Sequence, residues 1–300
     1  MWTERELISS FRLPDSTISK GGHVAYDGDT VVGTTFYGRP LLDNTEKTWI
    51  DVAVVPGHRG EGIGDALLQV LVEAAREAGR TTLLASAAYP FSARADHPHR
   101  RFAERHGFSV SLTEVRRSLT LPVPDDVVRG WIGEAAAHHG GYRIQTFHAG
   151  IESSLVDSFL EVFNQLTVEA PQGDVEWEAE AVTREAFEQR VHNDIEAGRD
   201  VYSSLAITSD DQVVAYSTLS VPAQGTTVSQ WGTLVASEHR GSRLGLAVKA
   251  AAIAEVQRRH PGYTRIDTTT AEVNAQMVAI NEHLGYTPVE IQAEFQLRLP

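Results

Sequence analysis

The sequence predicts a mixed α/β (α+β) protein that consists of two similar domains in tandem. Strand-like and helix-like segments alternate along the chain, and the order of the first half recurs in the second. Corresponding residues keep a constant offset of 181 positions, as between Val54 and Val235. Because solenoid repeats recur at roughly 20–50 residues, this offset indicates a duplicated domain. With 300 residues, 42% of them hydrophobic, the chain is long enough for two cores.

The first half begins with strands. Alternation of apolar and polar residues predicts them at 22–26, 30–37 and 48–55, with a hairpin turn at 27–29. Apolar residues three and four positions apart then predict a helix over 62–78, which Gly79 ends. A strand at 81–86, a short helix at 100–106 and a strand pair within 108–121 complete this half.

The second half repeats this order with additions before its central helix. We expect strands at 142–147, 201–208, 212–221, 228–235 and 264–268, helices at 154–165, 184–197, 242–259 and 274–283, and further strands up to the C-terminus. A Pro-Val-Pro segment at 122–124 separates the halves. The predicted domains are therefore residues 1–122 and 141–300, joined by a linker at 123–140.

Composition excludes several classes of function. The chain carries 26 Lys and Arg against 40 Asp and Glu, and this net charge of −14 opposes nucleic-acid binding. It has no cysteine, which excludes disulfides and cysteine nucleophiles, and its histidine pairs at 97/99 and 138/139 lack matching carboxylates for a metal. Neither an export signal nor a membrane-spanning segment is visible. We expect a cytoplasmic monomer or homodimer without metal, membrane or nucleic-acid partners.

In each half, a strand is followed by a loop that carries Arg and Gly and then by a long helix. Backbone N–H groups at such a helix N-terminus form a cradle for an anion. Gly60, Gly62 and Gly64 let a phosphate approach these amides closely, and Arg59 adds a forked cationic contact. The loop lacks the third glycine of a dinucleotide fingerprint, and no G-x-x-x-x-G-K-[ST] motif occurs in the chain.

The segment Arg59-Gly60-Glu61-Gly62-Ile63-Gly64 resembles the pyrophosphate loop of the GNAT superfamily of acyl-CoA N-acetyltransferases. The second copy, at 239–245, differs in having Arg243 where the family usually has glycine, and 274–286 resembles the family's second CoA-contacting helix. The whole pattern resembles two-domain actinobacterial GNAT proteins, a group that includes mycothiol-synthase-like enzymes. The resemblance implies a mostly antiparallel mixed sheet in each domain, flanked by helices, with a strand pair that splays to bind CoA.

The resemblance also implies acetyl-CoA as the cofactor and a set of cofactor-binding residues in each domain. These are Val54, Val55, Arg59, Gly60, Glu61, Gly62, Ile63 and Gly64 in the first domain, and Leu234, Val235, Ala236, Arg240, Gly241, Ser242, Arg243, Leu244, Gly245 and Asn274 in the second. Asn274 is equally explained as a helix N-cap. Asn281 stands where many members carry the tyrosine that protonates the departing thiolate, so it is the catalytic candidate, with a buried helix polar group as the alternative.

Acidic residues concentrate between Glu152 and Asp200, a segment that contains thirteen of them and only three arginines. Solvated helix faces explain such a run, and a pocket for a cationic ligand is the alternative. The first domain has too few residues before its strands for the family's acceptor-site helices, so we expect the second to be catalytic. It would move acetyl to the amine of a small, cationic acceptor that binds near Asp174, Glu176 and Glu178. A carboxylate or a water relay would first deprotonate the ammonium group of this acceptor. The alternative function is a non-catalytic CoA-binding or interaction protein.

Overall fold

A computed structural model describes residues 3–300 of the protein as two compact units. What we call the N-terminal unit comprises Pro14–Glu114, Gln172–Glu178 and Ile291–Pro300. The C-terminal unit comprises Val115–Pro171, Ala179–Glu290 and the residues up to Leu13. Each unit corresponds in the main to one predicted domain, but four segments belong to the unit of the other predicted domain. The units thus interleave along the sequence, which a single boundary near residue 122 does not describe.

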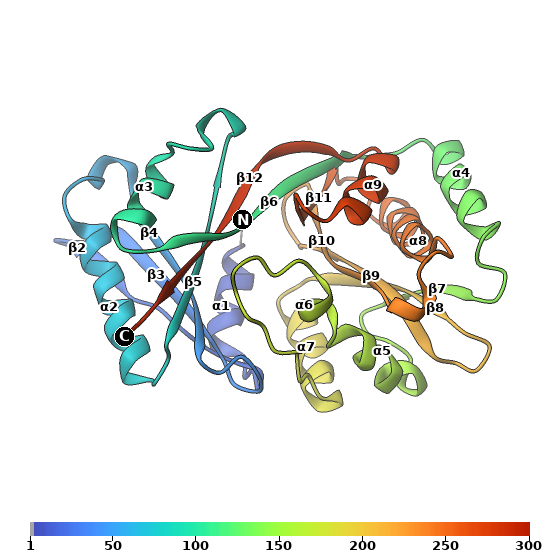
Figure 1. Ribbon diagram of the computed structural model, residues 1–300, viewed down its shortest axis with the longest axis horizontal. Coiled ribbons are helices and arrows are strands. Elements are labelled where there is room, and N and C mark those ends of the chain that lie inside the picture. The colour runs from blue at the N-terminus through green and yellow to red at the C-terminus, as the bar shows by residue number, and fades with distance from the viewer. Residues whose placement is uncertain (1–2) are drawn as a thin grey trace. The chain divides into compact units, whose positions relative to one another are not determined.

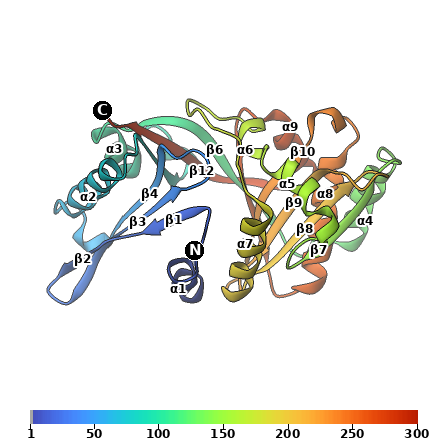
Figure 2. The same ribbon diagram turned by 90° about the horizontal axis from the view of Figure 1, so that it is seen from below.

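The sheet of the N-terminal unit is completed by the last strand of the chain. Its own strands are β1 (Ile18–Gly21), β2 (Val24–Asp27), β3 (Thr30–Pro40), β4 (Lys47–Val54) and β5 (Thr82–Tyr89), and its helices are α2 (Ile63–Glu77) and α3 (Pro98–Arg105). β12 (Thr287–Arg298) pairs antiparallel with β5 from Ile291 to Arg298, where Figure 1 shows it in dark red beside β5. Ile291 and Phe295 pack into the same core as Leu71 and Leu83. α2 lies across β3 and β4 (Figures 1 and 2).

β6 (Ser109–Thr120) is one long strand where the sequence predicted a pair. The segment contains no Gly, Pro, Asn or Asp that would favour a turn, so it continues without a break. Within the described residues the strands follow the order β1-β3-β4-β5-β12-β6-β11-β10-β9-β8-β7, and β2 also pairs with β3. β6 enters the C-terminal unit at Val115, while β12 enters the N-terminal unit at Ile291. The final strand of each half therefore begins in its own unit and continues into the other.

Helices cover both faces of the sheet in the C-terminal unit. Its remaining strands are β7 (Arg143–His148), β8 (Asp200–Ile207), β9 (Val213–Val221), β10 (Thr227–Val235) and β11 (Arg265–Ala271). Its helices are α1 (Glu4–Arg12), α4 (Asp125–Ala136), α5 (Val156–Phe163), α6 (Leu166–Glu169), α7 (Arg184–Glu196), α8 (Leu244–Arg259) and α9 (Ala275–His283). α8 packs on β8 and β9 together with α4, whereas α5 and α7 join a separate core with Tyr216. No helix of the described chain combines the length and apolar character of a membrane span.

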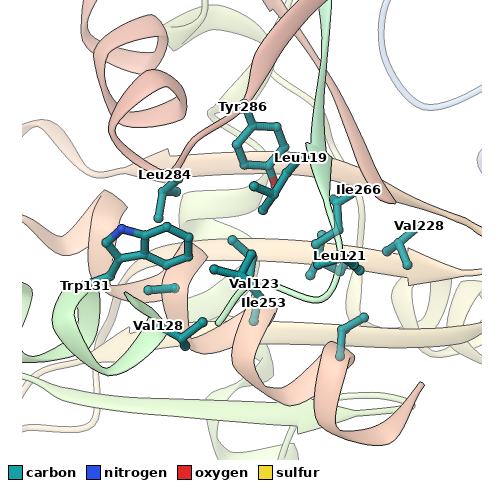
Figure 3. Close-up of a cluster of buried hydrophobic side chains, with 14 of the residues drawn as sticks. Leu119, Leu121, Val123, Val128, Trp131, Val228, Ile253, Ile266, Leu284 and Tyr286 are labelled. Atoms are coloured by element: carbon teal, nitrogen blue, oxygen red, sulfur yellow. The ribbon is translucent and has the colours of Figure 1, made fainter. Parts of the chain in front are cut away.

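The segment predicted as a linker holds α4, which packs into the core. Val128 and Trp131 are buried against Leu121, Ile253 and Leu284 (Figure 3). Gly130 and Gly133 lower the helix propensity of this segment, so its local sequence does not predict a helix. The helical spacing of its apolar residues becomes evident only from their burial. α1 was not predicted either, although Thr3 and Glu6 form a capping box at its start. Both helices are fixed by tertiary contacts.

Candidate functional site

In each unit, a parallel strand pair separates just before the Arg- and Gly-containing loop. β4 pairs with β5 only from Lys47 to Trp49, although it stays on β3 as far as Val54. β10 pairs with β11 only from Thr227 to Ser229, and an irregularity between Gln230 and Thr233 follows. Ligands of open sheets bind in the crevice at the carboxyl ends of parallel strands. The splayed strand pair expected from the family resemblance is present in both units.

The two loops follow the same backbone path. Arg59 Nε donates to the carbonyl oxygen of Val54 at 3.1 Å, and Arg240 Nε donates to that of Val235 at 3.2 Å. A short 3-10 turn precedes each arginine, at Pro56–His58 and Ser237–His239. Because each arginine is anchored to the end of the preceding strand, its guanidinium is held beside the N-terminus of the helix that follows. Both loops therefore have the backbone arrangement on which the predicted anion cradle depends.

Arg243 adopts the conformation that its glycine counterpart has in the first loop. Gly62 caps α2 with φ 82°, and Arg243 caps α8 with φ 54°, both in the left-handed region. A left-handed conformation costs a non-glycine residue about 1–2 kcal/mol. The second loop thus keeps the backbone conformation of the first although Arg243 replaces the glycine of the family motif. The arginine also adds a positive charge at the helix N-terminus.

The two helix N-termini differ in the charges around them. α2 carries Asp65 in its first turn and Glu61 in the loop before it, whereas no acidic residue occupies the first turn of α8. The positions that match Glu61 and Asp65 in the second loop are Ser242 and Leu246. Asp65 is bound by Arg105 at 2.9 Å and by His106 at 2.8 Å. Carboxylates at a helix N-terminus take the place of an external anion. The first turn of α2 holds such a carboxylate, and the first turn of α8 does not.

The C-terminal unit has a pocket of about 670 Å³ between the carboxyl end of β10, the N-terminus of α8 and α9. This volume lies within the usual range for ligand clefts, roughly 300–1,000 Å³. The pocket is lined by Glu134, Leu166, Glu169, Ala170, Thr233, Leu234, Val235, Arg240, Gly241, Arg243, Gly245, Leu246, Asn274, Gln276, Met277, Ala279, Ile280 and His283. The structure therefore brings seven predicted residues to one cavity, while Ala236, Ser242 and Leu244 are not part of its wall. Asn274 also caps α9, since its side chain accepts from the N–H of Met277 at 3.1 Å.

Two carboxylates engage the basic groups of the pocket. Arg240 Nη2 lies 2.7 Å from Glu169 Oε2, Arg243 forms an ion pair with Glu134, and His283 Nε2 lies 2.8 Å from the same carboxylate. Partly exposed ion pairs of this kind contribute about 0–1 kcal/mol each. Little free energy therefore opposes the exchange of these carboxylates for the phosphates of a ligand. Glu134 lies on α4, in the predicted linker, so sequence reasoning did not find it.

A buried polar network lies behind the irregular part of β10. Lys249 Nζ and the Tyr286 hydroxyl each donate to Gln230 Oε1 at 2.8 Å. Gln230 Nε2 donates to Ser217 Oγ at 2.6 Å, and this hydroxyl is 2.8 Å from the hydroxyl of Thr233, a pocket residue. Burial lowers the pKa of Lys249 to about 7. The network ties α8 to the wall of the pocket, and its only signal in the sequence is a lysine on an otherwise apolar helix face.

Asn281 lies in the core rather than at the pocket wall. Its side chain is fully buried, and Nδ2 donates to Thr270 Oγ1 at 2.9 Å. Asn281 Oδ1 has no hydrogen-bond partner in the described part of the chain, and the residue does not line the pocket. The structure thus fits the alternative of a buried helix polar group.

The predicted acceptor-site carboxylates belong to the N-terminal unit. Gln172–Glu178 packs there, with Trp177 stacked on Trp49 at 6.0 Å between ring centroids. Glu178 Oε2 accepts from the N–H of Asn44 at 2.7 Å, and the N–H of Asp174 donates to the carbonyl oxygen of Ser111 at 3.0 Å. None of Asp174, Glu176 and Glu178 lines the pocket of the C-terminal unit. The position of these residues in the sequence predicts that they belong to the acceptor site of the second domain. Their contacts correct this prediction, because they place the segment in the N-terminal unit.

Glu178→Ala tests this correction. We expect the substitution to reduce the free energy of unfolding by about 1–2 kcal/mol, because it leaves the N–H of Asn44 without its acceptor. Ligand affinity of the pocket in the C-terminal unit stays at the wild-type value. Urea unfolding followed by tryptophan fluorescence measures the effect. Glu176→Ala, an exposed neighbour, is the matched control and changes the free energy by less than about 0.5 kcal/mol. A change in ligand affinity with unchanged stability would contradict the assignment.

Comparison with known proteins gives two matches to models of one family. The model described as "Acetyltransferase (GNAT) domain" matches residues 19–110, and the one described as "Acetyltransferase (GNAT) family" matches residues 160–286. The chain belongs to the GNAT superfamily. It is a tandem GNAT N-acetyltransferase, and acetyl-CoA is the acyl donor of this family. Within the described residues, no group of three His, Asp or Glu side chains is arranged to hold a metal.

Solved structures with a similar fold include other GNAT proteins. A "Tandem GNAT protein from the clavulanic acid biosynthesis pathway (without AcCoA)" matches with a TM-score of 0.75 and 23% identity over 99% of this chain and 88% of that one. A GCN5-related N-acetyltransferase from Sphaerobacter thermophilus matches with a TM-score of 0.64 and 14% identity over 99% and 85% of the two chains. At these identities the similarity confirms the fold. Curated proteins give no significant match.

Proposed function

We propose that the C-terminal unit of this GNAT protein transfers the acetyl group of acetyl-CoA to the amine of a small acceptor. The observation that carries this proposal is the pocket at the carboxyl end of β10, which reaches a helix N-terminus flanked by Arg240 and Arg243. These groups suit the pyrophosphate of CoA, because amides at a helix N-terminus and guanidinium forks both bind phosphate oxygens. The remaining length of the pocket, along Leu234 and Ile280, suits the pantetheine arm.

The charges around the two loops support the choice of unit. Glu61 and Asp65 disfavour a polyanion at the N-terminus of α2, although that loop has the better family spelling. The matching residues Ser242 and Leu246 carry no charge, and Arg243 adds one of the favourable sign. We therefore assign productive acetyl-CoA binding to the C-terminal unit and a structural role to the loop of the N-terminal unit.

The transfer requires N–H or O–H donors for the negative charge that develops on the acyl oxygen. The N–H of Ala236 donates to the carbonyl oxygen of Val214 at 2.9 Å, so it is engaged within the sheet. We therefore assign the acyl-oxygen contact to β10 between Gln230 and Leu234, where the ladder with β9 is irregular. The acceptor is an amine in this proposal. No positive charge is required of this acceptor, because the carboxylates expected to bind it, Asp174, Glu176 and Glu178, lie in the N-terminal unit.

Calorimetry with acetyl-CoA and CoA, followed by thiol release across a panel of amines, tests this function. We expect one cofactor per chain and thiol release above the uncatalysed background with at least one amine. Binding without release from any amine would favour the alternative of a non-catalytic CoA-binding protein. A chain that binds neither compound would contradict both functions.

Glu134→Gln should strengthen CoA binding by about 2–5-fold, which corresponds to roughly 0.5–1 kcal/mol. Glu134 pairs with Arg243 and His283, so its neutral amide releases both groups for the ligand and removes a repulsive charge. Calorimetry at low ionic strength measures the affinity. Asp126→Asn, on the first turn of the same helix, removes the same charge away from the pocket and serves as the control. Weaker binding by Glu134→Gln would show that the carboxylate itself contacts the ligand.

A further inference from the structure

Tyr216 on β9 carries a buried hydroxyl without a partner. The side chain is fully buried, and its ring packs against those of Phe159 and Phe163, with centroids 5.4 and 5.8 Å away. Within residues 3–300 its oxygen has no hydrogen-bond partner. Two other buried tyrosines differ: the Tyr202 hydroxyl is 2.8 Å from His260 Nε2, and the Tyr286 hydroxyl donates to Gln230. Because an unsatisfied buried hydroxyl costs free energy, the group at Tyr216 calls for a ligand or a functional reason.

The hydroxyl lies against the irregular part of β10. A Cβ atom at Gly232 would come within 2.6 Å of the Tyr216 oxygen and within 2.6 Å of Leu166 Cδ2. Glycine is therefore the residue that lets this oxygen approach the backbone of β10. Tyr216 is also the cross-strand neighbour of Leu234. Since Leu166 and Leu234 both line the pocket, the hydroxyl stands directly behind its wall, beside the amides assigned above to the acyl oxygen.

We propose that the Tyr216 hydroxyl donates a hydrogen bond to the carbonyl oxygen of the bound acyl group. This inference rests on the proposed function and names a side chain for its acyl-oxygen contact. Burial raises the pKa of Tyr216, so the hydroxyl keeps its proton at neutral pH and acts as a donor. A donor fixed in a desolvated site binds the carbonyl oxygen and stabilises the charge that grows on it as the amine attacks. The tyrosine retains its proton throughout.

Tyr216→Phe tests the proposal, because it removes only the hydroxyl and keeps the ring in its aromatic cluster. We expect the affinity for acetyl-CoA to fall about 5–10-fold while that for CoA, which has no acyl group, is unchanged. kcat falls about 10–100-fold for the transfer to an amine. The melting temperature of the ligand-free variant is unchanged or higher, since no hydrogen bond is lost. Calorimetry and thermal unfolding give both readouts independently of activity.

Tyr202→Phe is the matched control, because it removes a buried hydroxyl that is bonded to His260, away from the pocket. It lowers the melting temperature and leaves the ratio of acetyl-CoA to CoA affinity at the wild-type value. A wild-type ratio in Tyr216→Phe, with CoA still bound, would overturn the role of Tyr216 and leave the proposed function intact. A wild-type protein that binds neither compound would overturn the proposed function and this inference together.

Discussion

Replacing Lys249 by methionine should flatten the pH dependence of stability between about pH 7 and 10.5. Burial lowers the pKa of Lys249 in the fold to about 7 from its ordinary value of 10.5. Between these values the unfolded chain binds a proton that the native state does not, so the wild-type free energy of unfolding rises with pH. One pKa unit corresponds to 1.36 kcal/mol, so the full rise is up to about 5 kcal/mol. Below pH 7 Lys249 is a buried ammonium in the native state, and the gain in the free energy of unfolding is lost.

Methionine has a similar length and no charge, so the variant is more stable than the wild type at pH 6 to 7. Gln230 Oε1 still accepts from Tyr286 in that variant, which limits the loss of hydrogen bonding. Denaturant unfolding at pH 6, 7, 8.5 and 10 measures how the free energy of unfolding changes with pH in the wild type and in the variant. Lys20→Met is the control, since Lys20 lies near the surface in an ion pair with Asp15 at 2.7 Å. A wild-type stability that does not change between pH 7 and 10 would mean that Lys249 is charged throughout.

The fold was predictable from the sequence where local pattern determines structure. The Arg- and Gly-containing loops and their helices lie where the motif placed them, because glycine spacing and apolar periodicity are local properties. The exchange of β6 and β12 was not predictable, since a strand's own residues do not specify which edge it will pair with. Arg243 shows a similar limit: its side chain departs from the motif, but the backbone of the loop keeps the left-handed turn.

The candidate site was predicted in part for the same reason. Arg240, Gly245 and Asn274 follow from motif position and do line the pocket. Lys249 and Tyr216 were missed, because a buried lysine and an unpaired hydroxyl become conspicuous only once their surroundings are known. The segment with Glu178 lies in the N-terminal unit, although its position in the sequence predicts the second domain, because nearness in sequence does not imply nearness in space. Sequence reasoning thus predicts the residues of the Arg- and Gly-containing loop better than the residues at the other end of the pocket.

Arg240→Ala should weaken CoA binding by about 10–100-fold, whereas Arg59→Ala should change it by less than 2-fold. Hydrogen bonds to charged groups contribute about 1.5–3 kcal/mol, which corresponds to this range of dissociation constants. Both guanidinium groups are anchored by Nε to the last carbonyl of the preceding strand, so the two substitutions remove the same local contact. They differ in the helix that follows, because Asp65 occupies the first turn of α2 while α8 has no acid there.

Calorimetry across a range of salt concentrations measures this difference. The Arg240→Ala variant shows a smaller salt dependence of binding than the wild type, since it has one cation fewer to screen. Arg240→Lys keeps the charge without the planar fork and gives an intermediate affinity. The opposite pattern, with loss of binding in Arg59→Ala alone, would move the productive site to the N-terminal unit. Arg105 and His106, which bind Asp65, would then offset enough of the acidic charge at the N-terminus of α2 for a phosphate to bind there.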